Sequence, residues 1–426
     1  MGGCRMGDVL KTSWALLLGM LLLMLGNGLQ GTLLGIRGGI EGFSTFEMSI
    51  IMSAYFVGFF GGSKLAPELI RRVGHIRVFA ALASFISAVL ILFPTITEPW
   101  AWMVLRAIIG FCFSGVYVTA ESWLNNAATN ENRGKSLSLY LIVQMLGIVT
   151  AQGVVALGDP SGFILFVIPS VLVSISFAPI LLSVNPTPAF ETTKAMSLRE
   201  LYAVSPLGCV GIFLLGGVFG VQFGMAAVYG TEAGMSVARI STFVATIYIG
   251  AMLLQYPIGW ISDRMDRRRL IMVVAVIGAG AGVMGMFMGS SYAMLLVAGF
   301  IMGGMSNPLY SLLLAYTNDF LELDDMAAAS GGLIFINGMG AIAGPVLTGW
   351  FMGMMGPPGF WFFMLLLMGA LSAYALYRMT QRPAVAVEDT GTYVGLSPSA
   401  SVVSVEAAQE WAVEEAEDAE KDTIAS

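Results

Sequence analysis

Apolar residues occur in long runs along most of the chain, and short polar or charged stretches separate the runs. A helix needs about 20 predominantly apolar residues to cross the roughly 30 Å hydrocarbon core of a bilayer. The pattern predicts an all-α membrane protein with twelve transmembrane helices, near residues 13–36, 45–69, 76–95, 99–125, 137–158, 162–184, 206–229, 237–261, 270–289, 292–318, 328–353 and 358–379.

Composition and charge agree with membrane insertion and predict an orientation. Apolar residues make up 57% of the 426 residues and charged residues only 11%, whereas soluble domains rarely exceed about 50% apolar. With twelve spans, 17 of the 20 Lys and Arg fall on one side, Arg37 and Arg239 fall on the other, and Arg106 lies within a span. Because basic residues near helix ends mark the cytoplasmic side, we expect a multi-pass protein of the cell inner (plasma) membrane with both termini cytoplasmic.

The two halves of the chain match each other at a nearly constant offset. A shift of 192 residues pairs Gly28 with Gly220, Gln30 with Gln222, Gly42 with Gly234, Ser44 with Ser236 and Gly58 with Gly250. Shifts of 189 and 191 residues pair Gly110 with Gly299 and Gly147 with Gly338. A displacement by six spans preserves the topology, so we expect two parallel six-helix repeats that pivot about a site near the bilayer midplane.

This repeat divides the chain into four predicted parts. They are an N-terminal six-helix bundle (1–184), a cytoplasmic linker (185–205), a C-terminal bundle (206–382) and a tail (383–426). The tail holds ten acidic residues against one lysine, whereas the whole chain has a net charge of −7. Because such acidic segments are usually solvated, we expect the tail to be disordered, with at most a weak helix over 406–421.

A dense group of charges, GWISDRMDRRR, occupies residues 259–269 between the eighth and ninth predicted spans. It resembles the loop signature Gly-x-Leu-x-Asp-Arg-x-Gly-Arg-Arg of the major facilitator superfamily (MFS), with matches at Gly259, Asp263, Arg264, Arg267 and Arg268. Asp266 stands where the signature has glycine, and a degraded first copy at 67–77 keeps Arg72. Over about residues 10–382 the chain resembles this superfamily, and within it a bacterial branch whose members mostly lack assigned substrates.

The resemblance implies that the charged loop is a conformational latch between the two halves. The residues that we expect to form it are Gly259, Asp263, Arg264, Arg267, Arg268 and Arg72. Positive-inside anchoring alone would also explain the arginines, but it gives no reason for an acid at position 263. Asp263 can accept hydrogen bonds from a helix N-terminus and pair with nearby arginines.

Polar side chains form stripes on the first, fourth, seventh and tenth spans, which the resemblance implies line a central cavity. A polar side chain within a span must face partners or water. We therefore predict a substrate cavity that contains Asn27, Gln30, Arg37, Ser114, Tyr117, Gln222, Tyr229, Asn307 and Ser311. Interhelical hydrogen bonding, at about 0.6 kcal/mol per contact, is the alternative role for these residues.

Two ionisable residues on the fourth span are candidates for proton coupling. Glu121 shares a helical face with Ser114 and Tyr117, because spacings of three and four residues return to one side. A carboxyl in this place is suited to proton exchange, although an ion pair with a cytoplasmic arginine is an equal alternative. The stretch RAIIG (106–110) is similar to the superfamily's fourth-helix Arg-x-x-x-Gly motif, so Arg106 is expected to modulate proton transfer or bind an anionic group, unless it snorkels to the outer interface.

These features predict a secondary active transporter that moves a small organic solute by alternating access, coupled to protons. The expected partners are a small-molecule substrate, protons and membrane lipid, with no nucleic acid and no second copy of the chain. We expect no enzymatic activity, no cofactor and no metal site, since the chain has one histidine and three scattered cysteines. A non-transporting membrane sensor or partner-binding protein is the alternative, and the acidic tail is its support.

Overall fold

The computed structural model describes residues 6–127, 133–178, 196–383, 385–387 and 390–425. Among these residues, eleven helices are long and apolar enough to cross a membrane, and a twelfth, Ile164–Ser176, is apolar but shorter. The predicted fold class is confirmed. The end of the predicted sixth span, from residue 179, and most of the predicted linker lie outside the described residues.

Each half of the chain contributes one bundle of helices. The first contains α1 (Met6–Ile40), α2 (Thr45–Val73), α3 (His75–Leu92), α4 (Pro99–Ala127), α5 (Arg133–Leu157) and α6 (Ile164–Ser176). The second contains α8 (Leu198–Val204), α9 (Pro206–Gly220), the π-turn η1 (Val221–Met225), α10 (Ala226–Glu232), α11 (Val237–Ser262), α12 (Arg267–Phe287), α13 (Tyr292–Asn318), α14 (Leu323–Met355) and α15 (Pro358–Gln381). The seventh predicted span is therefore α9, η1 and α10 in succession, and π-turns of this kind are frequent at functional sites.

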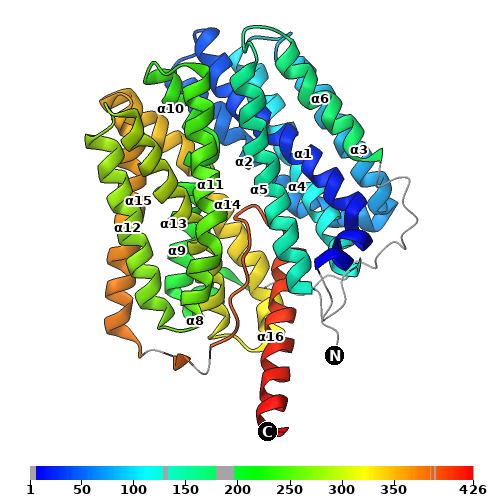
Figure 1. Ribbon diagram of the computed structural model, residues 1–426, viewed down its shortest axis with the longest axis vertical. Coiled ribbons are helices and arrows are strands. Elements are labelled where there is room, and N and C mark those ends of the chain that lie inside the picture. The colour runs from blue at the N-terminus through cyan, green and yellow to red at the C-terminus, as the bar shows by residue number, and fades with distance from the viewer. Residues whose placement is uncertain (1–5, 128–132, 179–195, 384, 388–389, 426) are drawn as a thin grey trace.

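The two bundles stand side by side and repeat the same packing (Figure 1). In the first bundle α2 packs on α4, α1 on α5 and α3 on α6; in the second, α11 packs on α13, α9 on α14 and α12 on α15. Between the bundles α2 contacts α14 and α5 contacts α11. These two contacts are equivalent under the repeat, so the bundles meet along two symmetry-related seams.

Equivalent turns begin the second helix of each repeat. Gly42 and Gly234 adopt positive φ angles of 79° and 68°, a conformation that glycine adopts without steric cost. Two residues later, Ser44 and Ser236 cap the next helix by accepting a hydrogen bond from the backbone N–H of Glu47 and Arg239. The offset between the two halves therefore reflects a repeated local structure.

Close helix contacts at glycine correct the offset of the fourth and tenth spans. A methyl group on Gly110 would collide with the carbonyl oxygen of Tyr55, and one on Gly303 would collide with that of Ile247. Tyr55 and Ile247 are related by the same shift as Gly42 and Gly234. The counterpart of Gly110 is therefore Gly303, one helical turn beyond the Gly299 that the sequence comparison had paired with it. Glycines one turn apart on α13 leave this register ambiguous in the sequence.

Close glycine contacts also correct the predicted alignment of α14 with α5, its counterpart in the first repeat. Gly147 on α5 lies against the carbonyl of Leu21, and Gly340 on α14 lies against the carbonyl of Phe213. Leu21 and Phe213 are themselves related by the shift that pairs the first and seventh spans. The counterpart of Gly147 is therefore Gly340 and not Gly338. With these two corrections the compared pairs share one nearly constant offset.

The contact at Gly110 gives a first prediction. Gly110→Ala is expected to lower the free energy of unfolding by about 1–3 kcal/mol, because the added methyl would press on a backbone carbonyl that cannot rotate away. Gly153→Ala on α5, where no atom of the described residues lies within 4 Å of the added carbon, is the matched control and should be neutral or slightly stabilising. Thermal unfolding in detergent measures both, and equal midpoints would contradict the close packing of α2 on α4.

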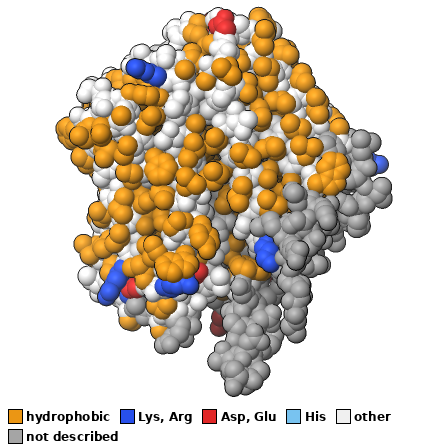
Figure 2. Space-filling view, in the orientation of Figure 1, with side chains coloured by type: hydrophobic (Ala, Val, Ile, Leu, Met, Phe, Trp, Pro, Cys, Tyr) orange, Lys and Arg blue, Asp and Glu red, His pale blue; other side chains and the backbone are white. Residues whose placement is uncertain are grey.

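The outer surface of the bundles is largely apolar in the view of Figure 2, and Lys and Arg side chains gather near its lower rim. That distribution is typical of a protein surrounded by acyl chains with a basic rim at one membrane face. The chain is therefore a multi-pass membrane protein. We refer to the end of the molecule at Arg264 as the inner end, and to the end at Arg239 as the outer end.

The tail differs from the expected solvated segment. After α15, residues 390–401 rise between the two bundles to about mid-height, and α16 (Val402–Ala425) then descends toward the inner end (Figure 1). Leu396, Ala400, Val405, Ala407 and Ala408 in this stretch are buried. The physical reason is visible in the sequence, because residues 390–405 contain no acidic residue and are mostly small or apolar.

Candidate functional site

A central cavity lies between the two bundles, and its wall is mainly aromatic. The free space in it that a water-sized molecule could occupy is about 50 Å³. The lining side chains include Asn27, Tyr55, Phe56, Phe59, Phe60, Tyr117, Gln144, Phe219, Phe223, Tyr248 and Asn337, together with tail residues 397–400. They come from α1, α2, α4, α5, α9, η1, α11 and α14, so both repeats contribute. Apolar walls with a few polar groups are typical of small-molecule sites.

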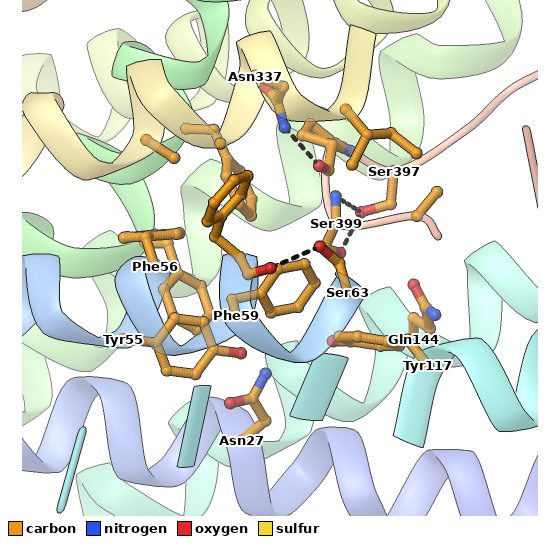
Figure 3. A pocket seen from close by; sticks show the side chains of 18 of the residues that line it. Asn27, Tyr55, Phe56, Phe59, Ser63, Tyr117, Gln144, Asn337, Ser397 and Ser399 are labelled. Carbon is orange, nitrogen blue, oxygen red and sulfur yellow. Dashed lines mark hydrogen bonds between the residues drawn. The ribbon is translucent and has the colours of Figure 1, made fainter. Parts of the chain in front are cut away.

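A polar network leads from the cavity wall into the first bundle. Asn27 lines the cavity, and Figure 3 shows it beside Tyr55. Gln30 donates to the Asn27 side-chain oxygen at 3.1 Å, and Arg106 donates to the Gln30 side-chain oxygen at 2.7 Å. The Arg106 guanidinium also lies 4.8 Å from the centre of the Tyr55 ring. The predicted residues Asn27, Gln30 and Arg106 are thus joined, with Arg106 one layer behind the wall.

Arg106 is fully buried, and its Nε has no hydrogen-bond partner among the described residues. Its contacts are neutral groups: the Gln30 amide, the Met52 sulfur and the Tyr55 ring. No ion pair within 4.0 Å involves Arg106 in the part of the chain that the structure describes. Buried charges are normally paired, so this guanidinium is held at an energetic cost. The structure places it inside the bundle and not at the outer interface where snorkelling would put it.

Glu121 lies near the inner end of α4, beside the tail. Its carboxylate accepts a hydrogen bond from the Tyr140 hydroxyl at 3.2 Å and from the backbone N–H of Ser401 at 2.9 Å. The residue is 2% exposed. The two partners are neutral donors, and they differ from the cytoplasmic arginine of the alternative prediction.

Arg106 and Glu121 lie on the same helix but far apart. Fifteen residues separate them, which corresponds to about 22 Å of helical rise. They therefore do not form a pair, and any coupling between them has to pass through the cavity or through movement of α4.

A second polar group, in the C-terminal bundle, connects α11 and α13 with the tail. Asn307 donates to the Gln255 side-chain oxygen at 3.0 Å, and Gln255 donates to the Ser311 hydroxyl at 3.2 Å. Ser311 in turn accepts from the backbone N–H of Leu396 at 2.8 Å. The predicted residues Asn307 and Ser311 thus lie at the interface of α13 with the tail.

The other predicted cavity residues are placed differently from one another. Tyr117 lines the cavity, whereas Ser114 faces Gly62 on α2 and the Gln222 side chain accepts a hydrogen bond from Ser306. Tyr229 stacks on Phe360 at 4.7 Å between ring centres, which is a packing role at the outer end. Arg37 pairs with Glu41 at 2.6 Å and donates to the carbonyls of Pro160 and Ser161. The structure therefore does not bring Arg37 or Tyr229 to the cavity.

The charged loop makes its strong contacts within the C-terminal half. Arg267 pairs with Asp319 at 2.5 Å, and both side chains are buried. Burial raises the pKa of the Asp319 carboxyl above its ordinary value, and the Arg267 guanidinium limits that rise. Asp263 lies 3.7 Å from Arg267 and accepts the backbone N–H of Tyr393 at 2.9 Å. In this conformation the Asp263 carboxylate is therefore hydrogen-bonded to the tail.

The remaining predicted latch residues are positioned by local contacts. Arg268 pairs with Asp266, the N-cap of α12, and donates to the carbonyl of Arg382. Arg264 lies over the Trp260 ring at 4.1 Å, and Arg72 pairs with Glu68 on its own helix. Gly259 leaves room for the Tyr393 ring, because a methyl group there would lie 2.5 Å from it.

The outer end of the cavity is closed by direct contacts between the bundles. Thr45 donates to the Glu232 carboxylate at 2.7 Å, and Ser53 donates to the carbonyl of Ile342 at 2.7 Å. Gly35 packs against Ala227 so closely that a methyl group on Gly35 would lie 2.7 Å from the Ala227 side chain. At the inner end the tail lies between the bundles. The two ends of the cavity are thus closed in different ways.

Sequence reasoning missed most of the aromatic wall and three amides. Tyr55, Phe56, Phe59 and Phe223 stand in apolar spans, where nothing in the pattern separates a cavity wall from core packing. Gln144, Gln255 and Asn337 carried a usable signal, because each is an amide within an apolar run on the fifth, eighth or eleventh span. Restricting the polar stripes to four spans excluded them.

Comparison with known proteins gives consistent relatives. The sequence profile of the Major Facilitator Superfamily matches residues 16–208 and again residues 208–400, so the two matches are displaced by the same shift as the repeat. An uncharacterized MFS-type transporter, YcaD, of Escherichia coli O7:K1 is 29% identical over 344 residues, which cover 78% of this chain and 87% of that protein.

Solved structures agree on the fold. The nucleoside transporter NupG superposes with a TM-score of 0.71 at 15% identity, and the alignment covers 87% of this chain and 98% of that one. A bacterial homologue of the human lysosomal transporter Spinster, in an inward-facing and unoccupied conformation, superposes with a TM-score of 0.68 at 12% identity over 95% and 98% of the two chains. At these identities the likeness concerns the fold alone.

Proposed function

Because the chain belongs to the Major Facilitator Superfamily, we propose that it is a secondary active transporter that moves a small organic solute by alternating access. One observation carries the proposal: a polar and aromatic cavity lies between two equivalent bundles, which touch each other directly at its outer end. Rocking of the bundles about this cavity would open the outer end and close the inner end. We interpret the arrangement in hand as an inward-facing state, because the bundles touch directly at the outer end, whereas at the inner end the tail lies between them.

The cavity wall suggests the class of solute. Its aromatic rings, among them Tyr55, Phe56, Phe59 and Phe223, offer flat faces for a planar or apolar part of a ligand. Asn27, Gln144 and Asn337 supply amide groups that donate and accept hydrogen bonds. We therefore propose an amphipathic solute with a flat apolar part and hydrogen-bonding groups. The buried charge of Arg106 behind the wall favours a neutral or anionic solute over a cationic one.

Proton coupling is proposed to pass through Glu121. This carboxyl is buried, hydrogen-bonded by neutral donors and placed at the inner end of α4, where a proton can reach it from the inner side when the inner end is open. Arg106, on the outer half of the same helix, is proposed to complete the coupling by responding to the protonation and ligand state of the cavity. The positive-inside distribution supports an inner (plasma) membrane location with both termini cytoplasmic.

The transport proposal is tested with purified protein in two steps. A metabolite library is screened by thermal unfolding, where a ligand at 100 times its Kd stabilises the folded state by about 2.7 kcal/mol. Each stabilising compound is then followed in labelled form into proteoliposomes, with protein-free liposomes as the control. We expect saturable, protein-dependent flux of at least one compound.

A non-transporting sensor is the second candidate, and the docked tail favours it. A sensor would bind the same ligand, and the ligand would change the tail without crossing the membrane. Compounds that stabilise the protein but never cross, with or without a proton gradient, would contradict the transport proposal and support the sensor.

A further inference from the structure

We propose that residues 393–411 form a plug, a segment of the chain's own tail that fills the inner end of the central cavity and holds the bundles in an inward-facing arrangement. This regulatory role rests on the transport function proposed above. The plug consists of an extended part, residues 393–401, and the first part of α16. Figure 3 shows Ser397 and Ser399 of this segment at the cavity, opposite Tyr117 and Gln144.

The extended part binds through its backbone, as a peptide ligand would. The N–H of Leu396 donates to the Ser311 hydroxyl at 2.8 Å, and the carbonyl of Pro398 accepts from the Asn337 amide at 2.8 Å. The N–H of Ser401 donates to the Glu121 carboxylate at 2.9 Å. The three side chains, Ser311, Asn337 and Glu121, belong to α13, α14 and α4. The plug is therefore hydrogen-bonded to side chains of the candidate site from both bundles.

The first turns of α16 repeat this bridging arrangement. Trp411 packs on Gly134 of α5, where a methyl group would lie 2.6 Å from the indole, and Glu410 pairs with Arg133 at 2.9 Å. On the other side, the Gln409 side chain accepts from Ser330 at 3.0 Å and donates to Asn318 at 2.9 Å. The helix is therefore wedged between α5 of the first bundle and α13 and α14 of the second.

The small side chains of the extended part allow it to enter the cavity. Gly395, Ser397, Ser399 and Ala400 carry at most two heavy side-chain atoms, and the acidic residues of α16 begin only at Glu406. A bulky or charged segment would have to bury unpaired groups at mid-height. The order of residues thus places a neutral tip in the cavity and the acidic part toward the inner end.

The wedge has a mechanical consequence for transport. To open the outer end, the inner ends of α4 and α5 must approach those of α13 and α14, and the plug occupies that space. The outward-open state therefore requires the plug to leave. We infer that the tail is an autoinhibitory segment that competes with solute for the cavity and sets the fraction of protein free to cycle.

Cysteine accessibility tests the plug without any substrate. Ser63→Cys places a thiol on α2 at the cavity wall, in a chain whose Cys4, Cys112 and Cys209 are replaced by serine. Arg71→Cys, at an exposed position near the inner end of the same helix, is the matched control thiol. A membrane-impermeant maleimide is added from the inner side, and the labelling rates of the two thiols are compared.

Two kinds of variant remove the plug. The first ends the chain after Pro383. The second, Leu396→Pro with Ser401→Pro, keeps the full length and removes the two backbone N–H donors to Ser311 and Glu121. Ala386→Pro, at an exposed position before the plug, is its matched control.

We expect the thiol at position 63 to react at least about tenfold faster in the truncated chain and in the double-proline variant than in the full chain or the Ala386→Pro control. A synthetic peptide of residues 390–412 should restore protection to the truncated chain. The thiol at position 71 should react equally in all four. A variant without the plug counts only if its thiol at position 71 is labelled at the normal rate. If the thiol at position 63 of such a variant reacts no faster than in the full chain, the inference is overturned.

These measurements separate the plug from the transport function. Labelling needs neither substrate nor gradient, so protection by the tail would be detected in a protein that moves nothing. Conversely, protein-dependent flux with an unprotected thiol would leave transport standing and remove the plug.

Discussion

Arg106→Gln is expected to abolish transport while leaving the folded protein at least as stable as the wild type. The guanidinium is fully buried, and within the described part of the chain it contacts only neutral groups and its Nε has no partner. Removing a buried charge that lacks a counter-ion relieves its desolvation cost. A residue that served only to hold the helices together would lower stability when replaced, whereas one kept for function would not.

The expected loss of transport is at least about tenfold, because a hydrogen bond to a charged group is worth about 1.5–3 kcal/mol and each 1.4 kcal/mol corresponds to a factor of about ten. Flux in proteoliposomes and the thermal unfolding midpoint are measured on the same preparation. Arg106→Lys keeps the positive charge but lacks the planar guanidinium with its several N–H donors, and it should retain part of the flux. A variant Arg106→Gln that transports normally, or that loses flux only in proportion to a lowered unfolding midpoint, would contradict a functional role.

Glu121→Gln is expected to remove proton-driven accumulation while leaving exchange of solute for solute intact. Glutamine has nearly the same shape: its side-chain oxygen can accept from the Ser401 N–H, and its NH2 group can donate to the Tyr140 hydroxyl oxygen. It cannot bind and release a proton. If one proton accompanies each solute, a gradient of one pH unit supplies about 1.4 kcal/mol and supports about tenfold accumulation in the wild type.

Accumulation at imposed pH gradients and counterflow at equal pH are compared for the wild type, Glu121→Gln and Glu68→Gln. Glu68 lies at the exposed inner end of α2 and is the control carboxylate. We expect the ratio of inside to outside solute to stay near one for Glu121→Gln, with a normal counterflow rate. Gradient-driven accumulation by this variant would assign the proton to another group, and loss of counterflow would show that Glu121 is needed for solute movement itself.

The fold was largely predictable because a bilayer demands uninterrupted apolar runs, and the chain supplies them at regular intervals. The residue-by-residue alignment of the two repeats was harder to predict. Gly58 and Gly250 correspond both in the sequence comparison and in the structure. Gly110 corresponds to Gly303, because Gly110 contacts Tyr55 and Gly303 contacts the equivalent Ile247, and the sequence does not display these contacts. The π-turn at 221–225 was also hidden, because its residues continue the apolar run without a break.

The site was predictable where polarity in an apolar run marks it. Asn27, Gln30, Tyr117 and Asn307 were found in this way, and the structure links them to the cavity or its neighbouring networks. Arg37 follows the same rule but lies near a helix end, where Glu41 and backbone carbonyls satisfy it outside the cavity. Helical spacing alone does not distinguish these two situations.

The tail shows how an average over a segment can mislead. Ten acidic residues in 383–426 suggested a solvated segment, but most of them follow Val405. The neutral stretch before them has the small side chains and free backbone groups that a polar cavity can bind. Counting charge in shorter windows would have separated the two parts, although it would not have shown where the first part lies.

The central claim is that the two bundles rock about the cavity, and distances between pairs of spin labels measure this most directly. One pair joins Ile40→Cys with Arg239→Cys at the outer end, and a second joins Arg71→Cys with Arg264→Cys at the inner end, all at exposed positions. Pulsed electron resonance in lipid nanodiscs records both pairs in the full chain and in the chain that ends after Pro383, with and without a transported solute. We predict two populations in which the outer distance lengthens as the inner distance shortens. Distances at both ends that stay fixed under all of these conditions, or that change in the same direction, would contradict alternating access.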